Sequence, residues 1–155
     1  MAARVMCALL GGTAHSKLFC NVREKLSLCY YCSSSYIRQK GIMLIESGIE
    51  RENIEKAQEA ILNEIKAMQN GDITDEELTA TKMSMSNAFV SGYDTVGGIN
   101  GHYLSQMLDS KVLSVQECVD KVNSVTKEDV VRCAKMLTLD TVYTLTGVFE
   151  EKEEV

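Results

Sequence analysis

This 155-residue chain lacks proline and has little histidine, which occurs only as His15 and His102. The lack of proline suits a helix-rich chain in which glycine and capping residues end the elements. A zinc site needs three or four well-placed ligands, and neither histidine belongs to an H-E-x-x-H motif or its inverse. We therefore expect no metal ligand and no cofactor-binding residue in this chain.

Long apolar runs and an excess of positive charge are also missing. No run reaches the roughly 20 apolar residues that span a bilayer, and the first ten residues lack the basic region followed by a long apolar region that marks a signal peptide. The net charge of -6 argues against nucleic acid or an anionic membrane as a partner. These absences predict a cytoplasmic protein with no nucleic-acid partner and no membrane contact.

Common catalytic motifs are absent as well. The chain contains neither the G-x-S-x-G motif of a serine nucleophile nor a glycine-rich phosphate-binding loop. Of the six cysteines, Cys29 and Cys32 have C-x-x-C spacing, but we place both in one strand, where residues three apart point to opposite faces. Structural thiols are therefore favoured over a metal site or a redox pair.

Length and composition indicate a single domain over residues 1–155, with 45% apolar and 25% charged residues. The apolar run Met1–Leu10 predicts a helix that ends at a pair of glycines. A second short helix follows, with Leu18 on its apolar side and Lys17 facing away. Because the chain begins abruptly in an apolar helix, we expect it to be a fragment of a longer protein.

Three segments have the composition and alternation of strands: Leu28–Tyr36, Gly41–Ile49 and Thr141–Phe149. Residues 37–40 predict a hairpin loop between the first two strands. The second strand is apolar on both faces, which is typical of a central strand. The last strand is expected to return and join the hairpin.

Amphipathic helices are predicted between the hairpin and the last strand. Residues 52–70 carry apolar residues at three- and four-residue steps, and a short helix is expected near Tyr103, after a flexible glycine-rich stretch. The order of elements predicts the α+β class, with a mainly antiparallel sheet and helices packed on one face. Three pairs have the pattern of capping boxes that begin further helices: Thr74 with Glu77, Ser114 with Glu117, and Thr126 with Asp129.

Arg23 and Tyr30 are the candidate site residues. They lie seven positions apart where a helix gives way to a strand, so they converge only if the linker between them folds back. A fixed cation beside a hydroxyl donor suits a carbonyl oxygen that gains negative charge. The alternative, from spacing alone, is an exposed arginine at a helix end and a half-buried strand tyrosine.

The segment Leu9–Tyr30 resembles the pattern LLGG-x-x-x-S-x-LF-x-x-x-RE-x-x-x-L-x-Y of the C-terminal domain of insulinase/pitrilysin zinc metallopeptidases. Gly41–Gly48 resembles the family's second strand, Ile73–Leu78 its T-x-E-E-L helix start, and Val125–Val130 its V-T-x-E-D-V helix start. The resemblance covers roughly residues 5–149 and is nearest to the bacterial processing-protease-like branch. It implies a LuxS/metallopeptidase-like layered sandwich that is truncated at its N-terminal side.

The resemblance also implies a clamshell of two homologous halves. In the family the N-terminal half carries H-x-x-E-H and a downstream glutamate, which hold zinc and activate water. The C-terminal half lacks that site and closes over the peptide, with an arginine and a tyrosine seven residues apart facing the chamber. Arg23 and Tyr30 fall on those positions, which implies that both bind substrate and stabilise the oxyanion.

Two hypotheses for function follow. In the first, the chain is the C-terminal domain of a zinc-dependent metalloendopeptidase. It binds the peptide substrate, is inactive alone, and relies on zinc in a partner half, either an N-terminal half in cis or a catalytic subunit in trans. In the second, the chain is a catalytically inactive family member that serves as a scaffold for a catalytic subunit. Dimerisation through an exposed sheet edge is left open.

Overall fold

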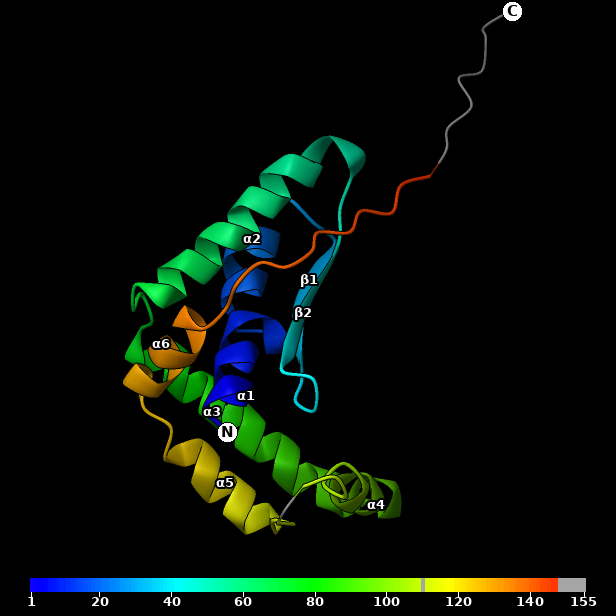
Figure 1. Cartoon of the computed structure of the whole chain (residues 1–155), viewed down its shortest axis with the longest axis vertical. Coiled ribbons are helices and arrows are strands. Elements are labelled where there is room, and N and C mark those ends of the chain that lie inside the picture. The colour runs from blue at the N-terminus through cyan, green and yellow to red at the C-terminus, as the bar shows by residue number, and fades with distance from the viewer. Residues whose placement is uncertain (110, 148–155) are drawn as a thin grey trace, which may run out of the picture.

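The computed structural model describes residues 1–109 and 111–147 of the chain. Most of these residues are helical, and a two-stranded antiparallel sheet packs beside the N-terminal helices (Figure 1). This combination confirms the α+β class. In chain order the elements are α1 (Ala2–Cys7), η1 (Ala8–Gly12), η2 (Leu18–Lys25), β1 (Tyr31–Ile37), β2 (Ile42–Gly48), η3 (Arg51–Asn53), α2 (Ile54–Gln69), α3 (Asp75–Ser91), η4 (Gly92–Asp94), α4 (Val96–Leu104), α5 (Val115–Asn123) and α6 (Lys127–Lys135).

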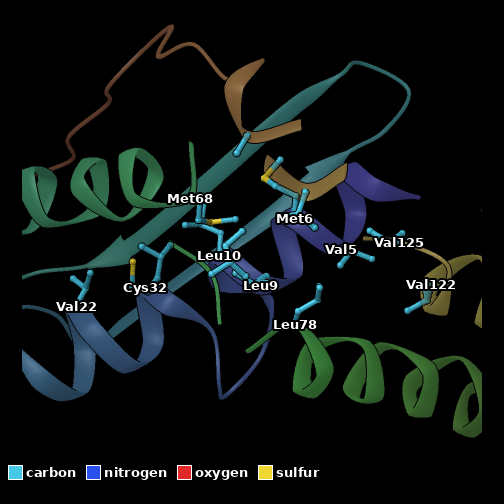
Figure 2. Packing of buried hydrophobic residues seen from close by; sticks show 14 residues of the cluster. Val5, Met6, Leu9, Leu10, Val22, Cys32, Met68, Leu78, Val122 and Val125 are labelled. Atoms are coloured by element: carbon cyan, nitrogen blue, oxygen red, sulfur yellow. The ribbon is translucent and has the colours of Figure 1, made fainter. Parts of the chain in front are cut away.

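The N-terminal segment, α1 followed directly by η1, is the centre of the hydrophobic core (Figure 2). Val5 and Leu10 are 0% exposed, and Leu9 is 1% exposed. Apart from Arg4 the segment carries apolar residues and glycines throughout, and α6, α3 and β1 all contact it. The helix predicted over Met1–Leu10 is confirmed, with π-helical rather than α-helical turns from Ala8 onwards.

The second helix, η2, packs its apolar side as predicted, since Leu18 and Val22 are both fully buried. The prediction that Lys17 faces away was wrong. Lys17 is buried, and its Nζ lies 2.9 Å from Oε1 of Glu77 in α3. A buried ammonium is tolerated when a carboxylate neutralises it, and that carboxylate lies 60 positions further along the chain.

The hairpin joins β1 and β2 in antiparallel register, with Tyr31 opposite Gly48 and Ile37 opposite Ile42. Its turn therefore spans residues 38–41, one position later than predicted. Gly41 has a φ of 65°, in the left-handed region that glycine adopts without steric penalty. The predicted hairpin is confirmed, with strands that are shorter than expected.

The predicted central position of the second strand was wrong for the part of the chain that the structure describes. There β2 has β1 as its neighbour on one edge and no strand on the other. Met43 and Ile45 pack against the core, whereas Ile42 and Leu44 on the opposite face are 50% and 44% exposed. Both faces are apolar, but only one is covered.

The predicted third strand, Thr141–Phe149, was also wrong for residues 141–147, which form no strand. This segment extends away from the helices (Figure 1), and Val142, Tyr143 and Leu145 are all exposed. Main-chain hydrogen bonds to a neighbour stabilise a strand, and within the described ranges only β1 and β2 pair. Val148 and Phe149 lie outside the described residues.

All three predicted capping boxes form. Thr74 Oγ1 accepts from the Glu77 main-chain N–H at 3.1 Å, and Glu77 Oε2 accepts from the Thr74 N–H at 2.8 Å. The same reciprocal bonds begin α5 and α6. Among the described residues, every helix is too short or too polar to cross a membrane.

The glycine-rich stretch that we expected to be flexible is largely the helix α4, which begins earlier than predicted. Thr95 caps this helix by accepting from the Gly98 N–H at 3.0 Å. A Cβ on Gly98 would collide with the main-chain oxygen of Gly92. Close packing of the preceding turn, rather than flexibility, is therefore the role of glycine at this position.

Candidate functional site

Arg23 lies in the last turn of η2, where three neighbours hold its guanidinium. The group lies over the Phe19 ring, 4.7 Å from its centroid, as cation–π pairs do. Its Nη1 lies 2.9 Å from Oε1 of Glu24, and its Nε donates to the main-chain oxygen of Tyr30 at 2.8 Å. The side chain is thus held at both its flat face and its edge.

The linker between Arg23 and Tyr30 does fold back. Leu26 and Leu28 donate their N–H groups to Asn21 and Val22, which closes the end of η2. Ser27 follows with a φ of 50°, a left-handed conformation that reverses the chain direction and is uncommon outside glycine. This reversal brings the guanidinium to the main-chain oxygen of Tyr30, whereas the Tyr30 hydroxyl bonds to Glu50.

Tyr30 lies immediately before β1 and is 67% exposed. Its N–H donates to the main-chain oxygen of Gly48 at 2.8 Å, which fixes its backbone to the end of β2. Its hydroxyl donates to Oε1 of Glu50 at 2.7 Å. This hydrogen bond and the charge of the carboxylate raise the pKa of the Tyr30 phenol above its ordinary value, because ionisation would remove the proton from the bond and place two negative charges together.

Two open depressions share these side chains. The larger, of about 460 Å³, is lined by the end of η1 and the residues that follow it, by Phe19 and by the first residues of β1. The smaller, of about 320 Å³, is lined by Ser27, Glu50 and neighbouring residues. Arg23 and Tyr30 line both depressions, so a ligand in either one can reach them.

The arrangement can donate hydrogen bonds to an oxygen that carries or develops negative charge. A guanidinium has five N–H donors, and within the described residues only those of Nε and Nη1 are taken up. The remaining donors are positioned by the contacts with Phe19 and Tyr30. A fixed cation with free donors is the kind of group that stabilises an oxyanion.

The cysteines differ from prediction in geometry. Cys29 precedes β1, so the argument that Cys29 and Cys32 point to opposite faces of one strand was wrong. Burial, with a smaller contribution from Cys29, raises the pKa of Cys32 to about 11, which makes its reactive thiolate scarce at neutral pH. All six cysteines are free thiols in this structure.

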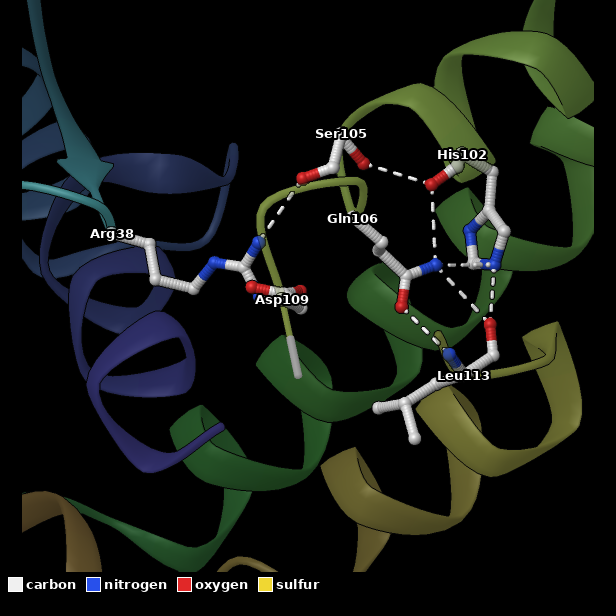
Figure 3. Close-up of polar contacts among 6 residues, drawn as sticks. All are labelled: Arg38, His102, Ser105, Gln106, Asp109 and Leu113. Carbon is white, nitrogen blue, oxygen red and sulfur yellow. Dashed lines mark hydrogen bonds and ion pairs between the residues drawn. The ribbon is translucent and has the colours of Figure 1, made fainter. Parts of the chain in front are cut away.

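The histidines lie apart and are not grouped as metal ligands. His15 is exposed, whereas Nε2 of His102 lies 2.8 Å from the main-chain oxygen of Leu113 and 2.9 Å from Nε2 of Gln106 (Figure 3). Within residues 1–109 and 111–147, no three His, Cys, Asp or Glu side chains are gathered to hold a metal ion. The donor set of these residues does not fit a zinc site.

The network around His102 is structural. Gln106 Oε1 accepts from the Leu113 N–H at 2.9 Å, which ties the end of α4 to the chain before α5. Arg38 in the hairpin turn pairs with Asp109 and donates to the Ser105 main-chain oxygen at 3.1 Å (Figure 3). These bonds fasten the hairpin turn to the segment after α4.

Sequence reasoning missed Glu50, the residue that holds the Tyr30 hydroxyl. The signal that could have found it is the hairpin register, because a residue two positions beyond Gly48 comes beside Tyr30 only when Tyr31 lies opposite Gly48. The predicted turn was one position too early. Moving a four-residue turn by one position shifts every cross-strand pairing by two residues and would place Glu46, rather than Gly48, opposite Tyr31, so Glu50 was not recognised.

Comparisons with known proteins agree with this architecture. The family described as "Peptidase M16 inactive domain" matches residues 1–85. A curated relative, "Probable inactive metalloprotease YmfF" of Bacillus subtilis, is 36% identical over 146 residues, which cover 94% of this chain and 34% of the relative. "Uncharacterized zinc protease YmxG" of the same organism is 25% identical over 136 residues, which cover 86% of this chain and 33% of that relative.

A solved structure of a conserved protein from Enterococcus faecalis V583 superposes with a TM-score of 0.78 at 32% identity. The match covers 86% of this chain and 32% of that chain. The chain therefore spans about a third of the length of the curated relatives and of this structural neighbour.

Proposed function

The chain belongs to the insulinase/pitrilysin (M16) peptidase family and corresponds to its inactive C-terminal domain, and from this premise we propose that it forms the substrate-binding lid of a peptidase. Arg23 and Tyr30 are its substrate-facing residues. The guanidinium binds a carbonyl oxygen of the peptide and stabilises the negative charge that develops there during hydrolysis. Zinc, in this proposal, is held by another half of the protein and not by this chain.

The position of the Arg23 guanidinium, bonded to the Tyr30 main chain at the wall of two open depressions, carries this proposal. A surface arginine with no role beyond solubility has many rotamers to sample, and fixing it costs conformational entropy. Here Phe19, Glu24 and the Tyr30 main chain fix the guanidinium at the wall of two open depressions. An arginine positioned in this way is ready to bind an oxygen ligand without further ordering, which favours affinity.

Peptide binding by this chain tests the proposal directly. Fluorescein-labelled casein, an unstructured polypeptide, is titrated with the chain, and binding is followed by fluorescence anisotropy. We expect Arg23→Ala to weaken binding about tenfold or more, since it removes a charged donor. The matched control is Lys25→Ala, which removes the same charge from an exposed position two residues away. Equal affinities for the two variants would contradict the proposal.

The partner in this proposal is a catalytic half, either in cis or as a separate subunit in trans. The scaffold hypothesis is kept as an alternative, because the relative with 36% identity carries the name "Probable inactive metalloprotease YmfF". The complete protein, assayed for zinc content and casein hydrolysis, distinguishes the two. Zinc-dependent hydrolysis favours the lid of a peptidase, whereas an intact protein with neither zinc nor hydrolysis favours the scaffold.

We also propose that the sheet forms part of a LuxS/metallopeptidase-like layered sandwich. The support is the outer face of the hairpin, where Ile42 and Leu44 leave apolar surface exposed next to an edge of β2 that pairs with no strand in the described part of the chain. Exposed apolar strands of this kind are normally paired or covered. Hydrogen exchange of the β2 main chain tests this: slower exchange in the complete protein than in this chain supports added strands.

A further inference from the structure

The Tyr30 hydroxyl is already committed inside this chain. A phenol has a single proton to donate, and Tyr30 donates it to Glu50 at 2.7 Å. Resting on the proposed function, we propose that Glu50 is a positioning residue that competes with the substrate for the Tyr30 hydroxyl. Glu50 keeps the Tyr30 hydroxyl from donating its hydrogen bond to neutral carbonyl oxygens. The hydroxyl donates this bond instead to a substrate oxygen once that oxygen becomes negatively charged.

The backbone holds Glu50 in place for this role. The Tyr30 N–H donates to the main-chain oxygen of Gly48, the last residue of β2. Because Glu50 follows Gly48 by only two residues, this bond keeps Glu50 close to the tyrosine. On its other side, the Glu50 main-chain oxygen accepts from the Asn53 N–H at 2.9 Å, at the start of η3. The carboxylate is therefore presented from a short connection between β2 and η3 that is hydrogen-bonded at both ends.

The Glu50 carboxylate is not paired with the nearby arginine and can accept the hydrogen bond of the Tyr30 hydroxyl. Arg23 is the nearby cation that lines the same depression, but its ion pair in the described part of the chain is with Glu24. The Tyr30 ring is mostly exposed, so packing contributes little to its orientation. The bond to Glu50 is accordingly the main contact that directs the hydroxyl.

Competition between acceptors then makes the tyrosine selective. An ionised carboxylate accepts a hydrogen bond more strongly than a neutral peptide carbonyl does. The Tyr30 hydroxyl therefore keeps its hydrogen bond to Glu50 while the peptide is intact. An oxyanion is a comparable acceptor to the carboxylate and can take the bond over. An interaction made only in the transition state raises kcat without tightening substrate binding.

The test is a double-mutant cycle on casein binding. Glu50→Gln keeps the size of the side chain but weakens the acceptor, so we expect fluorescein-labelled casein to bind about two- to tenfold more tightly. The gain should disappear in Glu50→Gln combined with Tyr30→Phe, because that double variant has no hydroxyl to release. Tyr30→Phe alone completes the cycle, and it leaves the Arg23 bond to the Tyr30 main chain intact.

Glu52→Gln is the matched control, since it removes the same charge from an exposed position two residues away. A second readout is the titration of Tyr30 followed by NMR of chain labelled with [13Cζ]tyrosine. The pKa of Tyr30 should fall in Glu50→Gln and stay unchanged in Glu52→Gln. Equal casein binding by Glu50→Gln and the unmodified chain, or an unmoved Tyr30 titration, would overturn the role of Glu50. The proposed function fails separately, if Arg23→Ala binds casein as well as Lys25→Ala does.

Discussion

The Lys17 ammonium lies 2.9 Å from the Glu77 carboxylate and joins the start of η2 to the first turn of α3. The two partners are unequal, because the Lys17 side chain is 5% exposed and the Glu77 side chain is 26% exposed. Glu77 also closes the capping box of α3 through its second oxygen. One carboxylate thus neutralises a buried cation and caps a helix.

This inequality predicts which partner is more costly to replace. Glu77→Gln keeps the capping geometry but leaves the Lys17 ammonium buried without a counter-ion. We expect it to lower the free energy of unfolding by about 2–4 kcal/mol, somewhat less than for a fully buried pair. Lys17→Met removes the buried charge and leaves a carboxylate that water can reach, so its cost should be smaller. Urea unfolding measures both, and a larger loss for Lys17→Met would contradict the argument.

Gly11 should tolerate replacement by alanine less well than its neighbour Gly12. A Cβ on Gly11 would lie 2.7 Å from the Ser34 main-chain nitrogen in β1, whereas a Cβ on Gly12 would lie 3.3 Å from the Ala8 Cβ. We expect Gly11→Ala to cost about 1–3 kcal/mol, because overpacking pushes η1 away from β1. Gly12→Ala should cost less than about 1 kcal/mol. Thermal unfolding of both variants checks the difference, and similar losses would argue against the tight contact of η1 with β1.

Helix starts could be predicted from the sequence because their signals are local. The capping boxes at Thr74, Ser114 and Thr126 bring together groups only three residues apart, and all three form. The burial of Lys17 could not be predicted in the same way, because its partner is distant in sequence. The prediction of a strand over residues 141–147 was wrong for a related reason. Alternation of apolar and polar residues indicates which face is buried, but a strand also needs a neighbouring strand to pair with.

The candidate site could be predicted only in part. The spacing of Arg23 and Tyr30 and the family resemblance identified the pair, and the structure brings the Arg23 side chain to the Tyr30 main chain. The reversal at Ser27 depends on a left-handed φ of 50° in a residue other than glycine, which no residue preference announces. Glu50 depends on the hairpin register, and a turn placed one residue early conceals it.

Acid should destabilise the chain partly through Glu117. Its hydrogen bond with Lys111, together with those from Ser114, lowers the pKa of Glu117 from 4.5 to about 2. A carboxyl whose pKa is lower in the folded state stabilises that state fully above about pH 4.5, and this contribution is lost as the pH falls toward 2. Glu117→Gln keeps a capping side chain without the charge, so its Tm should fall less between pH 6 and pH 3 than that of the unmodified chain.

The control for this prediction is Glu59→Gln, which removes one carboxylate from an exposed position in the middle of α2. Its Tm should follow the same pH dependence as that of the unmodified chain. Parallel Tm curves for Glu117→Gln and the unmodified chain would show that the bonds to Lys111 and Ser114 do not contribute.

Arg23 gives the sharpest prediction for the complete peptidase that we propose. Arg23→Ala removes the donor aimed at the developing oxyanion, and we expect kcat/KM for a casein-derived peptide to fall on the order of a hundredfold. Arg23→Lys keeps the charge but loses the planar fork that bonds to the Tyr30 main chain while lying over Phe19. Its kcat/KM should therefore fall by about tenfold or more, because the two cations are not interchangeable at such a site. Zinc content, measured by atomic absorption, should be the same in all three proteins, since this chain supplies no ligand in the proposal. Unchanged kcat/KM, or zinc lost together with activity, would show that Arg23 does not act on the substrate.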